Sequence, residues 1–178
     1  MTKLLILDKD GTLVRPVSGA KFVQSPEDQG LLPGVAEALA RYRADGWVMA
    51  IASNQGGVAA GYKTLDSAIA EMRYCLRLLP QIYNAYFCPD LEGQKCWHVE
   101  KGFAQSLDHK YRNGLGEPYK GLYRKPNHGM ISHIQMIETF PNPKETLFVG
   151  DRPEDECAAE AAGVRFMWAD DWRAYTMS

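Results

Sequence analysis

Two aspartates, Asp8 and Asp10, stand directly after a short aliphatic run near the start of the chain, in the stretch DKDGT. The run LLIL before them is typical of a buried strand, and residues two apart on a strand project to the same side. Carboxylates held this close repel each other unless a cation or a shared proton lies between them. The pattern therefore predicts a divalent metal site in which one carboxylate acts as a nucleophile and the other as an acid or base.

The same stretch has two other interpretations. Asp and Gly also form ordinary turns. The DxDG pattern also begins a calcium-binding loop, but that loop follows a helix and needs a glutamate at its twelfth position, where this chain has Gly19. The calcium loop is therefore disfavoured, and the choice between a turn and a catalytic pair depends on the rest of the chain.

Strands and helices are expected to alternate along the chain. Apolar runs predict buried strands at 3–7, 47–52, 85–88, 146–149 and 164–168. Helical patterns lie between them at 35–45, 65–79, 130–138 and 154–162. Thr64 is a candidate N-cap of the second helix. The alternation predicts a Rossmann-like α/β fold, in which a parallel sheet has helices on both faces, and the length of 178 residues fits one domain.

In such a sheet, the loops that follow the strands share one edge. Asp8 and Asp10 would meet there with Ser53, which ends the second apolar run, and with the acidic stretch 150–155. Lys125 precedes the helix that leads into the next strand. Because chance does not readily bring polar groups from four separate places to one edge, this convergence favours a catalytic site over an ordinary turn.

The composition indicates a globular protein without a strong electrostatic field. A formal net charge of −2 provides no general attraction for nucleic acid or for an anionic membrane. No apolar stretch approaches the roughly 20 residues that span a bilayer, and the first residues lack the pattern of a signal peptide. We therefore expect a cytoplasmic protein with no membrane partner. Of its four cysteines, Cys75 and Cys157 are expected to be small core residues of helices.

The ordered motifs resemble those of the haloacid dehalogenase (HAD) superfamily of phosphatases. Its DxDG[TV] motif matches 8–12, and its Ser or Thr at the end of a hydrophobic strand matches Ser53. Its lysine matches Lys125, and its GDxxxD motif matches 150–155. The resemblance implies a HAD-like fold and a Mg²⁺-dependent phosphomonoesterase. A phosphotransferase that uses the same residues, and a binding protein without catalysis, are the alternatives; the intact motif set disfavours the second.

The resemblance also implies a role for each matched residue. Asp8 would attack phosphorus and form an aspartyl-phosphate, while Asp10 would protonate the leaving oxygen and then deprotonate the hydrolytic water. Ser53 and Lys125 would bind the phosphoryl oxygens. Mg²⁺ would be held by Asp8, Asp151 and the backbone carbonyl of Asp10. Phosphoryl transfer depends on positioning and on neutralising spread negative charge, which these groups can supply.

Asp155, the last member of the acidic motif, has two interpretations. It could orient Lys125 or a metal-bound water. Alternatively, it is a solvated carboxylate that favours the first turn of its helix.

The chain has no segment long enough for a full cap domain. The stretch 13–33 is too short for one, and the insert at about 89–124 is longer but still short of one. The motifs ASNQGG at 52–57 and RKPNHGM at 124–130 resemble the capless subfamily of histidinol-phosphate phosphatase, heptose-bisphosphate phosphatase and the 3′-phosphatase domain of polynucleotide kinase. The resemblance therefore implies an open site that admits a large or protruding substrate.

A zinc site is suggested by the first two of those enzymes, which carry a zinc-binding loop. The candidate ligands here are Cys88, Cys96 and His98, with Asp90 as a fourth. Tyr123 stands where a zinc-loop cysteine would precede the Arg-Lys-Pro motif, so the sulfur-rich pattern is incomplete. The alternative is a loop whose cysteines are reduced and bind no metal.

The substrate class remains open between small metabolites and nucleic-acid ends. The segment 100–125 has six Lys or Arg and three Asp or Glu, with tyrosines at 111, 119 and 123 that could stack on bases. Tyrosines packed on the body of a solvated loop are the favoured interpretation. Arg124 is a candidate for a second substrate anion, and Asn54 for a further substrate contact. Because the net charge is not basic, we expect a phosphorylated sugar or other small metabolite, with a nucleic-acid 3′-phosphate as the alternative.

Overall fold

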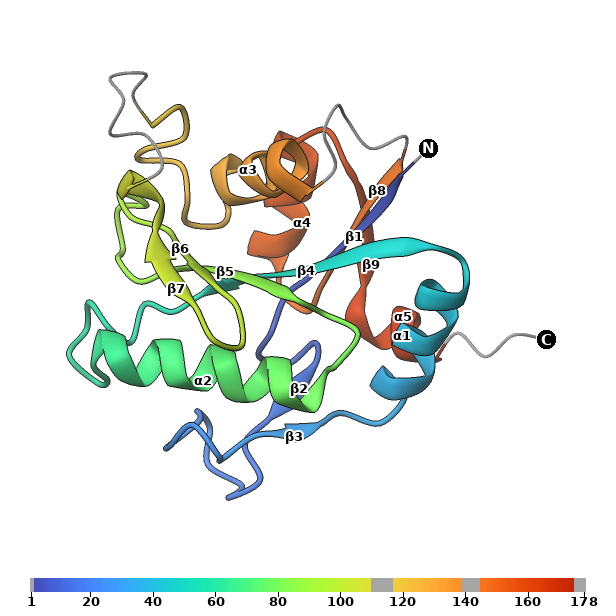
Figure 1. Ribbon diagram of the computed structural model, residues 1–178, viewed down its shortest axis with the longest axis horizontal. Helices are drawn as coiled ribbons and strands as arrows, with labels where there is room; N and C mark the ends of the chain where they lie inside the picture. Colours follow the sequence, from blue (N-terminus) through green and yellow to red (C-terminus); the bar gives the residue numbers. More distant parts are fainter. Residues whose placement is uncertain (1, 110–116, 139–144, 175–178) are drawn as a thin grey trace.

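A computed structural model describes residues 2–109, 117–138 and 145–174 of the protein. The described residues form a seven-stranded sheet in the order β7-β6-β5-β4-β1-β8-β9 (Figure 1). Its strands are β1 (Lys3–Leu7), β4 (Trp47–Asn54), β5 (Asn84–Cys88), β6 (Trp97–Val99), β7 (Ala104–Ser106), β8 (Glu145–Gly150) and β9 (Arg165–Trp168). The short strands β2 (Val14–Arg15) and β3 (Gly30–Leu31) pair with each other in a separate ribbon.

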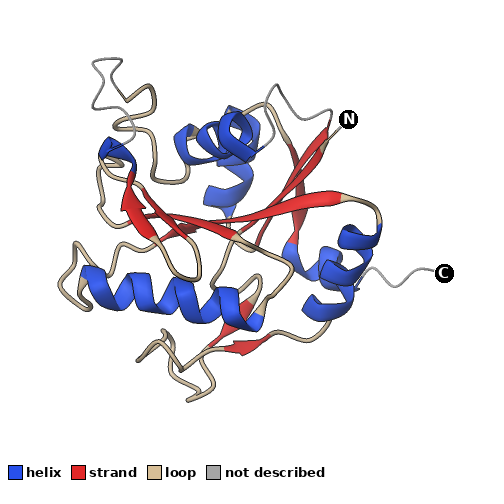
Figure 2. Ribbon diagram, viewed as in Figure 1, coloured by secondary structure: helices blue, strands red, loops and turns tan. Residues whose placement is uncertain are grey.

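Five helices accompany the sheet in the described part of the chain. They are α1 (Val35–Ala44), α2 (Leu65–Leu78), α3 (Gly129–Glu138), α4 (Pro153–Ala161) and α5 (Ala169–Ala174), and a 3₁₀ turn spans Leu107–His109. Figures 1 and 2 show α3 and α4 on one face of the sheet and α1, α2 and α5 on the other. The protein therefore has three layers, as an α/β fold requires.

The alternation of side chains along β1 divides the core between these two faces. Leu5 and Leu7 pack in the cluster that contains residues of α1, α2 and α5. Leu4 and Ile6 point the other way and pack with residues of α3 and α4. A central parallel strand is buried on both faces, so its buried residues are apolar whichever face they point to. This is why residues 4–7 of β1, which follow the partly buried Lys3, form an uninterrupted aliphatic run.

The strands β5, β4, β1, β8 and β9 are parallel, so the loops that follow them lie at the same edge of the sheet. The insert extends the sheet with antiparallel strands: β6 pairs antiparallel with β5, and β7 pairs antiparallel with β6. The described part of the insert thus forms an edge of the sheet and not a separate cap. None of the described helices is both long and apolar enough to cross a membrane.

The expected elements are confirmed, with ends that differ by one or two residues. The elements that the sequence did not predict are β2, β3, β6, β7 and α5, all of which are too short to show a periodic pattern. Cys75 is buried in α2 as expected, but the expectation for Cys157 is wrong, because this residue is exposed on α4.

The predicted N-cap of α2 offers a test of the local structure. The Thr64 hydroxyl accepts a hydrogen bond from the backbone N–H of Ser67, at 3.1 Å. We expect Thr64→Ala to lower the free energy of unfolding by about 1 kcal/mol and the melting temperature by roughly 2–4 °C. Thr64→Ser keeps the acceptor and should melt close to the wild type; equal losses in both variants would contradict the capping role.

Candidate active site

The polar segments that were expected to converge do so at the carboxyl edge of the sheet. Asp8 directly follows β1, Ser53 lies at the end of β4, and Asp151 directly follows β8. Lys125 comes from the loop before α3 and reaches across to this edge. The sheet therefore brings together residues that lie more than a hundred positions apart in sequence.

Lys125 is the centre of the site. Its buried Nζ donates hydrogen bonds to Asp8 Oδ1 at 2.7 Å and to Asp155 Oδ1 at 2.6 Å. A third bond, at 3.0 Å, goes to the backbone carbonyl of Ala52 at the end of β4. The three donors of the ammonium group are thus directed at three fixed acceptors. This geometry places a positive charge beside the carboxylate predicted to be the nucleophile.

Asn54 holds the backbone of Lys125 in place. Its side-chain amide donates to the Lys125 carbonyl at 2.9 Å, and its side-chain oxygen accepts from the Lys125 N–H at 3.1 Å. Both the nitrogen and the oxygen of this side-chain amide therefore form hydrogen bonds within the protein. These contacts fix the backbone of the predicted phosphate-binding lysine, and a contact of Asn54 with the substrate stays a prediction.

Asp155 contacts Lys125 and also caps the helix in whose first turn it lies. One oxygen accepts from Lys125, while the other accepts from the backbone N–H groups of Asp151 and Arg152, at 3.2 and 3.1 Å. The second set of bonds caps the first turn of α4. Asp155 is buried, so it is not a solvated carboxylate. It orients Lys125 from the N-terminus of a helix.

The electrostatics of the site favour a bound cation. Burial raises the pKa of Asp8 to about 7, against the opposing effect of Lys125 and with a further contribution from the charge of Asp155. Partial burial and the charge of Asp155 also raise the pKa of Asp151. Burial would lower the pKa of Lys125, but the carboxylates of Asp8 and Asp155 outweigh it and raise that pKa. The three carboxylates of Asp8, Asp151 and Asp155, when ionised, also carry more negative charge than one lysine neutralises.

Asp8 and Asp151 have the chemistry that a magnesium ion needs. Carboxylate oxygens of Asp8, Asp151 and Asp155 lie within 4.8 Å of one another, and Mg²⁺ prefers oxygen ligands. Both oxygens of Asp155 accept hydrogen bonds, from Lys125 and from two backbone N–H groups, whereas the bond to Asp8 Oδ2, from the Thr12 hydroxyl, is longer at 3.4 Å. Asp8 and Asp151 are therefore the members better able to bind a metal. The side chain of Asp10 is directed elsewhere, so its predicted contribution would come from its backbone carbonyl.

Two glycines leave the space that these carboxylates occupy. Gly11 has a φ of +84°, and a Cβ there would lie 2.2 Å from Asp151 Oδ2. At Gly150, a Cβ would lie 2.4 Å from the Cβ of Asp155. Any larger residue at either position must displace an aspartate. The loop after β1 is further held by Arg173 of α5, which donates to the carbonyls of Gly11 and Thr12 at 3.2 and 2.7 Å.

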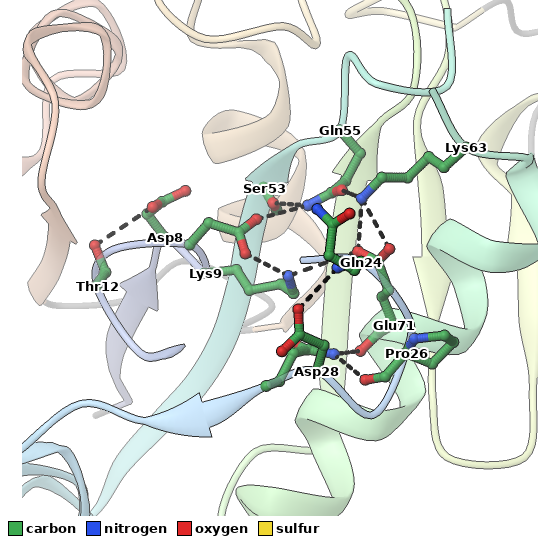
Figure 3. Close-up of polar contacts among 12 residues, drawn as sticks. Asp8, Lys9, Thr12, Gln24, Pro26, Asp28, Ser53, Gln55, Lys63 and Glu71 are labelled. Atoms are coloured by element: carbon green, nitrogen blue, oxygen red, sulfur yellow. Dashed lines mark hydrogen bonds and ion pairs between the residues drawn. The ribbon is translucent and has the colours of Figure 1, made fainter. Parts of the chain in front are cut away.

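Asp10 and Ser53, the predicted phosphate-binding serine, share one hydrogen-bond donor, Gln55, which Figure 3 shows between Ser53 and Lys63. One Asp10 oxygen accepts from Lys9 Nζ at 2.6 Å, and the other accepts from Gln55 Nε2 at 3.0 Å. The same Gln55 nitrogen donates to Ser53 Oγ at 2.9 Å. The structure thus brings Asp10 and Ser53 together, as predicted, but through a residue that was not expected to matter.

The candidate zinc ligands are not gathered around one point. Cys88 and Cys96 are buried, but in the described residues they and His98 do not form a group of potential ligands within 4.8 Å of one another. The His98 ring stacks on Tyr86 with a centroid distance of 4.7 Å, and its Nε2 lies 2.8 Å from Asn84 Oδ1. Burial raises the pKa of the Cys88 thiol to about 12. An aromatic core occupies this part of the insert.

The tyrosines of the insert pack on the body of the protein where the structure describes them. Tyr123 is fully buried and donates its hydroxyl hydrogen to Glu117 at 3.0 Å. Tyr119 meets His128 edge-on at 6.0 Å, and Tyr111 lies outside the described residues. Tyr123 is therefore not available to stack on a nucleic-acid base, which agrees with the favoured interpretation.

Three buried or half-buried residues near Asp10 were missed by the sequence reasoning: Lys9, Gln55 and Glu71. Lys9 is the central residue of the DKDGT stretch, and Gln55 stands two residues after Ser53. Their positions inside matched motifs are a signal that could have been used. Glu71 lies on the apolar side of the α2 pattern, where a lone charged residue indicates a buried partner.

The role of Asp155 can be tested by its effect on stability. Asp155→Asn removes the charge that holds Lys125 and weakens the cap of α4, so we expect a loss of about 2 kcal/mol in the free energy of unfolding. Glu154→Gln removes a charge from the same helical turn at an exposed position and should change stability by less than about 0.5 kcal/mol. Denaturant unfolding measures both, and similar losses would contradict the role assigned to Asp155.

Comparison with known proteins agrees with this geometry. The family model described as polynucleotide kinase 3 phosphatase matches residues 3–173. The D-glycero-beta-D-manno-heptose-1,7-bisphosphate 7-phosphatase of Bordetella bronchiseptica is 38% identical over 164 residues, which cover 85% of this chain and 89% of that protein. The D-glycero-D-manno-heptose-1,7-bisphosphate 7-phosphatase of Thermosynechococcus vestitus is 31% identical over 166 residues, covering 89% of this chain and 74% of that protein.

A solved structure shares the same architecture. The D,D-heptose 1,7-bisphosphate phosphatase from B. bronchiseptica, complexed with magnesium and phosphate, superposes with a TM-score of 0.63 at 26% identity, covering 93% of this chain and 79% of that one. The family match spans nearly all of the chain and includes each predicted catalytic residue. The chain therefore belongs to the polynucleotide kinase 3 phosphatase family, within the HAD superfamily of phosphatases.

Proposed function

We propose that this protein hydrolyses a sugar phosphate through an aspartyl-phosphate formed on Asp8. The observation that carries the proposal is the buried contact of 2.7 Å between Asp8 and Lys125, at the carboxyl edge of the sheet. It puts a nucleophile and a cation at one point, which is what attack on a negatively charged phosphoryl group requires. Ser53, from the neighbouring strand β4, adds a hydroxyl donor.

In the first half of the reaction, an oxygen of Asp8 bonds to phosphorus as the bond between phosphorus and the substrate oxygen breaks. Protonated Asp10 gives its proton to that departing oxygen. Lys125 and Ser53 bind the phosphoryl oxygens while their negative charge is redistributed. The products of this half are the free alcohol and phosphorylated Asp8.

In the second half, Asp10 takes a proton from water as the water oxygen bonds to phosphorus. The bond between phosphorus and Asp8 then breaks, which releases inorganic phosphate and restores the Asp8 carboxylate. Asp10 ends this half protonated, as the first half requires. One residue therefore serves as acid and then as base.

Magnesium is the metal in the proposal, and Asp8, Asp151 and the backbone carbonyl of Asp10 are the groups that would hold it. When bound, it would neutralise charge on Asp8 and on the phosphoryl oxygens. The solved relative from B. bronchiseptica contains magnesium. We do not extend the proposal to zinc, because Cys88, Cys96 and His98 are not arranged as a ligand group.

A heptose bisphosphate is the substrate that the relatives support best. Both curated relatives described above are named heptose-1,7-bisphosphate 7-phosphatases. A bisphosphate needs a second anion site, and Arg124 is suited to it. Its Nη1 donates to the carbonyl of Asp90 at 3.3 Å, and a Cβ at Gly56 would lie only 3.0 Å from that nitrogen. The guanidinium is therefore held beside the loop that follows Ser53.

Nucleic-acid 3′-phosphates form the second candidate class. The matched family model is described by an activity on polynucleotides. Against it stand the net charge of −2 and the burial of Tyr123. A substrate panel separates the two classes.

The first test measures phosphate release from sugar phosphates, sugar bisphosphates, nucleotides and 3′-phosphorylated oligonucleotides, with Mg²⁺ and with EDTA. We expect fast, Mg²⁺-dependent release from a sugar bisphosphate, in amounts equal to the alcohol formed. Asp8→Asn should fold normally by circular dichroism and release no phosphate. Full activity of that variant would refute the mechanism, and alcohol in excess of phosphate would indicate transfer to another acceptor.

The second test concerns Arg124. Arg124→Ala should raise KM for a sugar bisphosphate by about tenfold or more, because a charge-assisted hydrogen bond is lost, and should leave KM for the corresponding monophosphate nearly unchanged. Lys120→Ala removes an exposed positive charge from the same insert and is the matched control. Equal effects of Arg124→Ala on both substrates would contradict a second anion site.

A further inference from the structure

Asp10 belongs to a closed ring of polar side chains, whose other members, Lys9, Gln55, Lys63 and Glu71, are labelled in Figure 3. Lys9 Nζ lies 2.6 Å from Asp10 Oδ1 and 4.0 Å from Glu71 Oε2. Glu71 accepts two hydrogen bonds from Lys63 Nζ, at 2.7 and 2.9 Å. The ring closes because Lys63 donates to Gln55 Oε1 at 3.2 Å and Gln55 Nε2 donates to Asp10 Oδ2 at 3.0 Å. We call these five residues the Asp10 ring.

The charges of the Asp10 ring are balanced and mostly inside the protein. Lys9 and Glu71 are 0% and 1% exposed, whereas Lys63 is half-buried. Two lysines face two carboxylates, so the ring carries no formal net charge. Buried ion pairs add little stability, since apolar residues of similar size often replace them without loss. Stability alone is therefore a poor explanation for burying a lysine and a glutamate beside Asp10, the proposed acid/base.

The geometry of the ring acts on the carboxylate of Asp10. Each oxygen has its own donor, so rotation about the Cβ–Cγ bond breaks a hydrogen bond in either direction. One donor, Gln55, also binds Ser53 Oγ, which fixes Asp10 relative to the phosphate-binding hydroxyl. Both donors are in turn linked to Glu71. Lys9 lies 4.0 Å from its carboxylate, and Gln55 accepts a hydrogen bond from Lys63, which also donates to Glu71. Glu71 of α2 is thus connected to both hydrogen-bond donors of Asp10.

Glu71 is itself fixed by its surroundings. It lies in the middle of α2, among residues that pack against the sheet. Its backbone carbonyl accepts a hydrogen bond from the side chain of Gln29 at 3.0 Å, which joins α2 to the loop before β3. The backbone of Glu71 is therefore held in place, which fixes the position of its carboxylate relative to Lys9 and Lys63.

We propose that Glu71 is a positioning residue that, through Lys9 and through Lys63 and Gln55, holds Asp10 where it exchanges protons with the leaving oxygen and with water. The inference rests on the hydrolysis proposed above. It concerns the half-reactions that need Asp10, and not the attack by Asp8, which Lys125 and Asp155 position from the other face of the sheet.

4-Nitrophenyl phosphate separates the two halves of the reaction. Its leaving group departs without a proton, so phosphorylation of Asp8 depends little on Asp10, whereas hydrolysis of the aspartyl-phosphate still needs a base. A variant that misplaces Asp10 therefore accumulates phosphorylated enzyme during turnover. A variant that merely loosens the fold loses rate without that accumulation.

The main experiment compares Glu71→Gln with the wild type on this substrate, in the presence of Mg²⁺. We expect kcat to fall by roughly tenfold to a hundredfold, with KM nearly unchanged. The fraction of enzyme that carries a phosphoryl group, measured by intact mass after acid quenching, should rise. Asp66→Asn removes an exposed carboxylate from the same helix and should behave as the wild type.

A double-mutant cycle tests whether Glu71 acts through Asp10. If it does, Glu71→Gln should cause no further loss of kcat in the Asp10→Asn background. Multiplication of the two effects would overturn the inference, as would a fall in kcat of Glu71→Gln without a rise in phosphorylated enzyme.

Variants at Lys63 keep the test decisive if Glu71→Gln fails to fold. Lys63 is less buried than Glu71. Lys63→Met should accumulate phosphorylated enzyme with a smaller loss of kcat. Lys63→Arg keeps a positive charge next to Glu71 and should retain much of the wild-type rate. Failure of this pattern in folded variants would refute the role of the ring and leave phosphatase activity intact. A wild type that forms no phosphorylated enzyme and releases no phosphate would instead refute the proposed function, and the inference with it.

Discussion

The site depends on one buried cation, Lys125, held between two carboxylates. Its Nζ lies 2.7 Å from Asp8 and 2.6 Å from Asp155. A buried ammonium without such partners would cost several kcal/mol, so the loop after β1, the loop before α3 and the start of α4 must come together if Lys125 is to be buried at all. The same arrangement leaves a positive charge beside the nucleophile. Burial of Lys125 during folding and the proposed binding of a phosphoryl group thus both require these three segments to meet around Lys125.

The sequence was sufficient to predict the parallel part of the sheet and which motif residues meet at its carboxyl edge, for a physical reason. The central strands of a parallel sheet are buried on both faces, so β1 and β8 each contain an apolar run, and their carboxyl ends mark the site. The sequence was not sufficient to predict hydrogen-bond partners that are set by tertiary packing. Asn54 stands in a motif that suggests substrate contact, and only the fold shows both ends of its amide bound to Lys125.

The zinc set shows why a residue pattern does not fix a metal site. Cys88 and Cys96 belong to the same buried cluster, together with Tyr86 and Tyr123. The His98 ring stacks on Tyr86, and Tyr123, at the sequence position where the resemblance predicts a zinc-loop cysteine, is fully buried in this cluster. A metal site needs ligand atoms that meet at one point at defined distances, whereas a core needs only volume. Here the aromatic side chains satisfy the second requirement.

The two motif aspartates are each held by a buried lysine, and each lysine is held by a carboxylate from a helix. Asp155 of α4 holds Lys125, which binds Asp8. Glu71 of α2 lies within 4.0 Å of Lys9, which binds Asp10. These two series of contacts share no residue, and α4 and α2 lie on opposite faces of the sheet (Figure 1). Asp8 and Asp10, the proposed nucleophile and the proposed acid/base, are therefore held by separate contacts, although they stand two residues apart in the sequence. Such separation is what the reaction requires, because Asp8 must keep its place on phosphorus while Asp10 gives up one proton and accepts another.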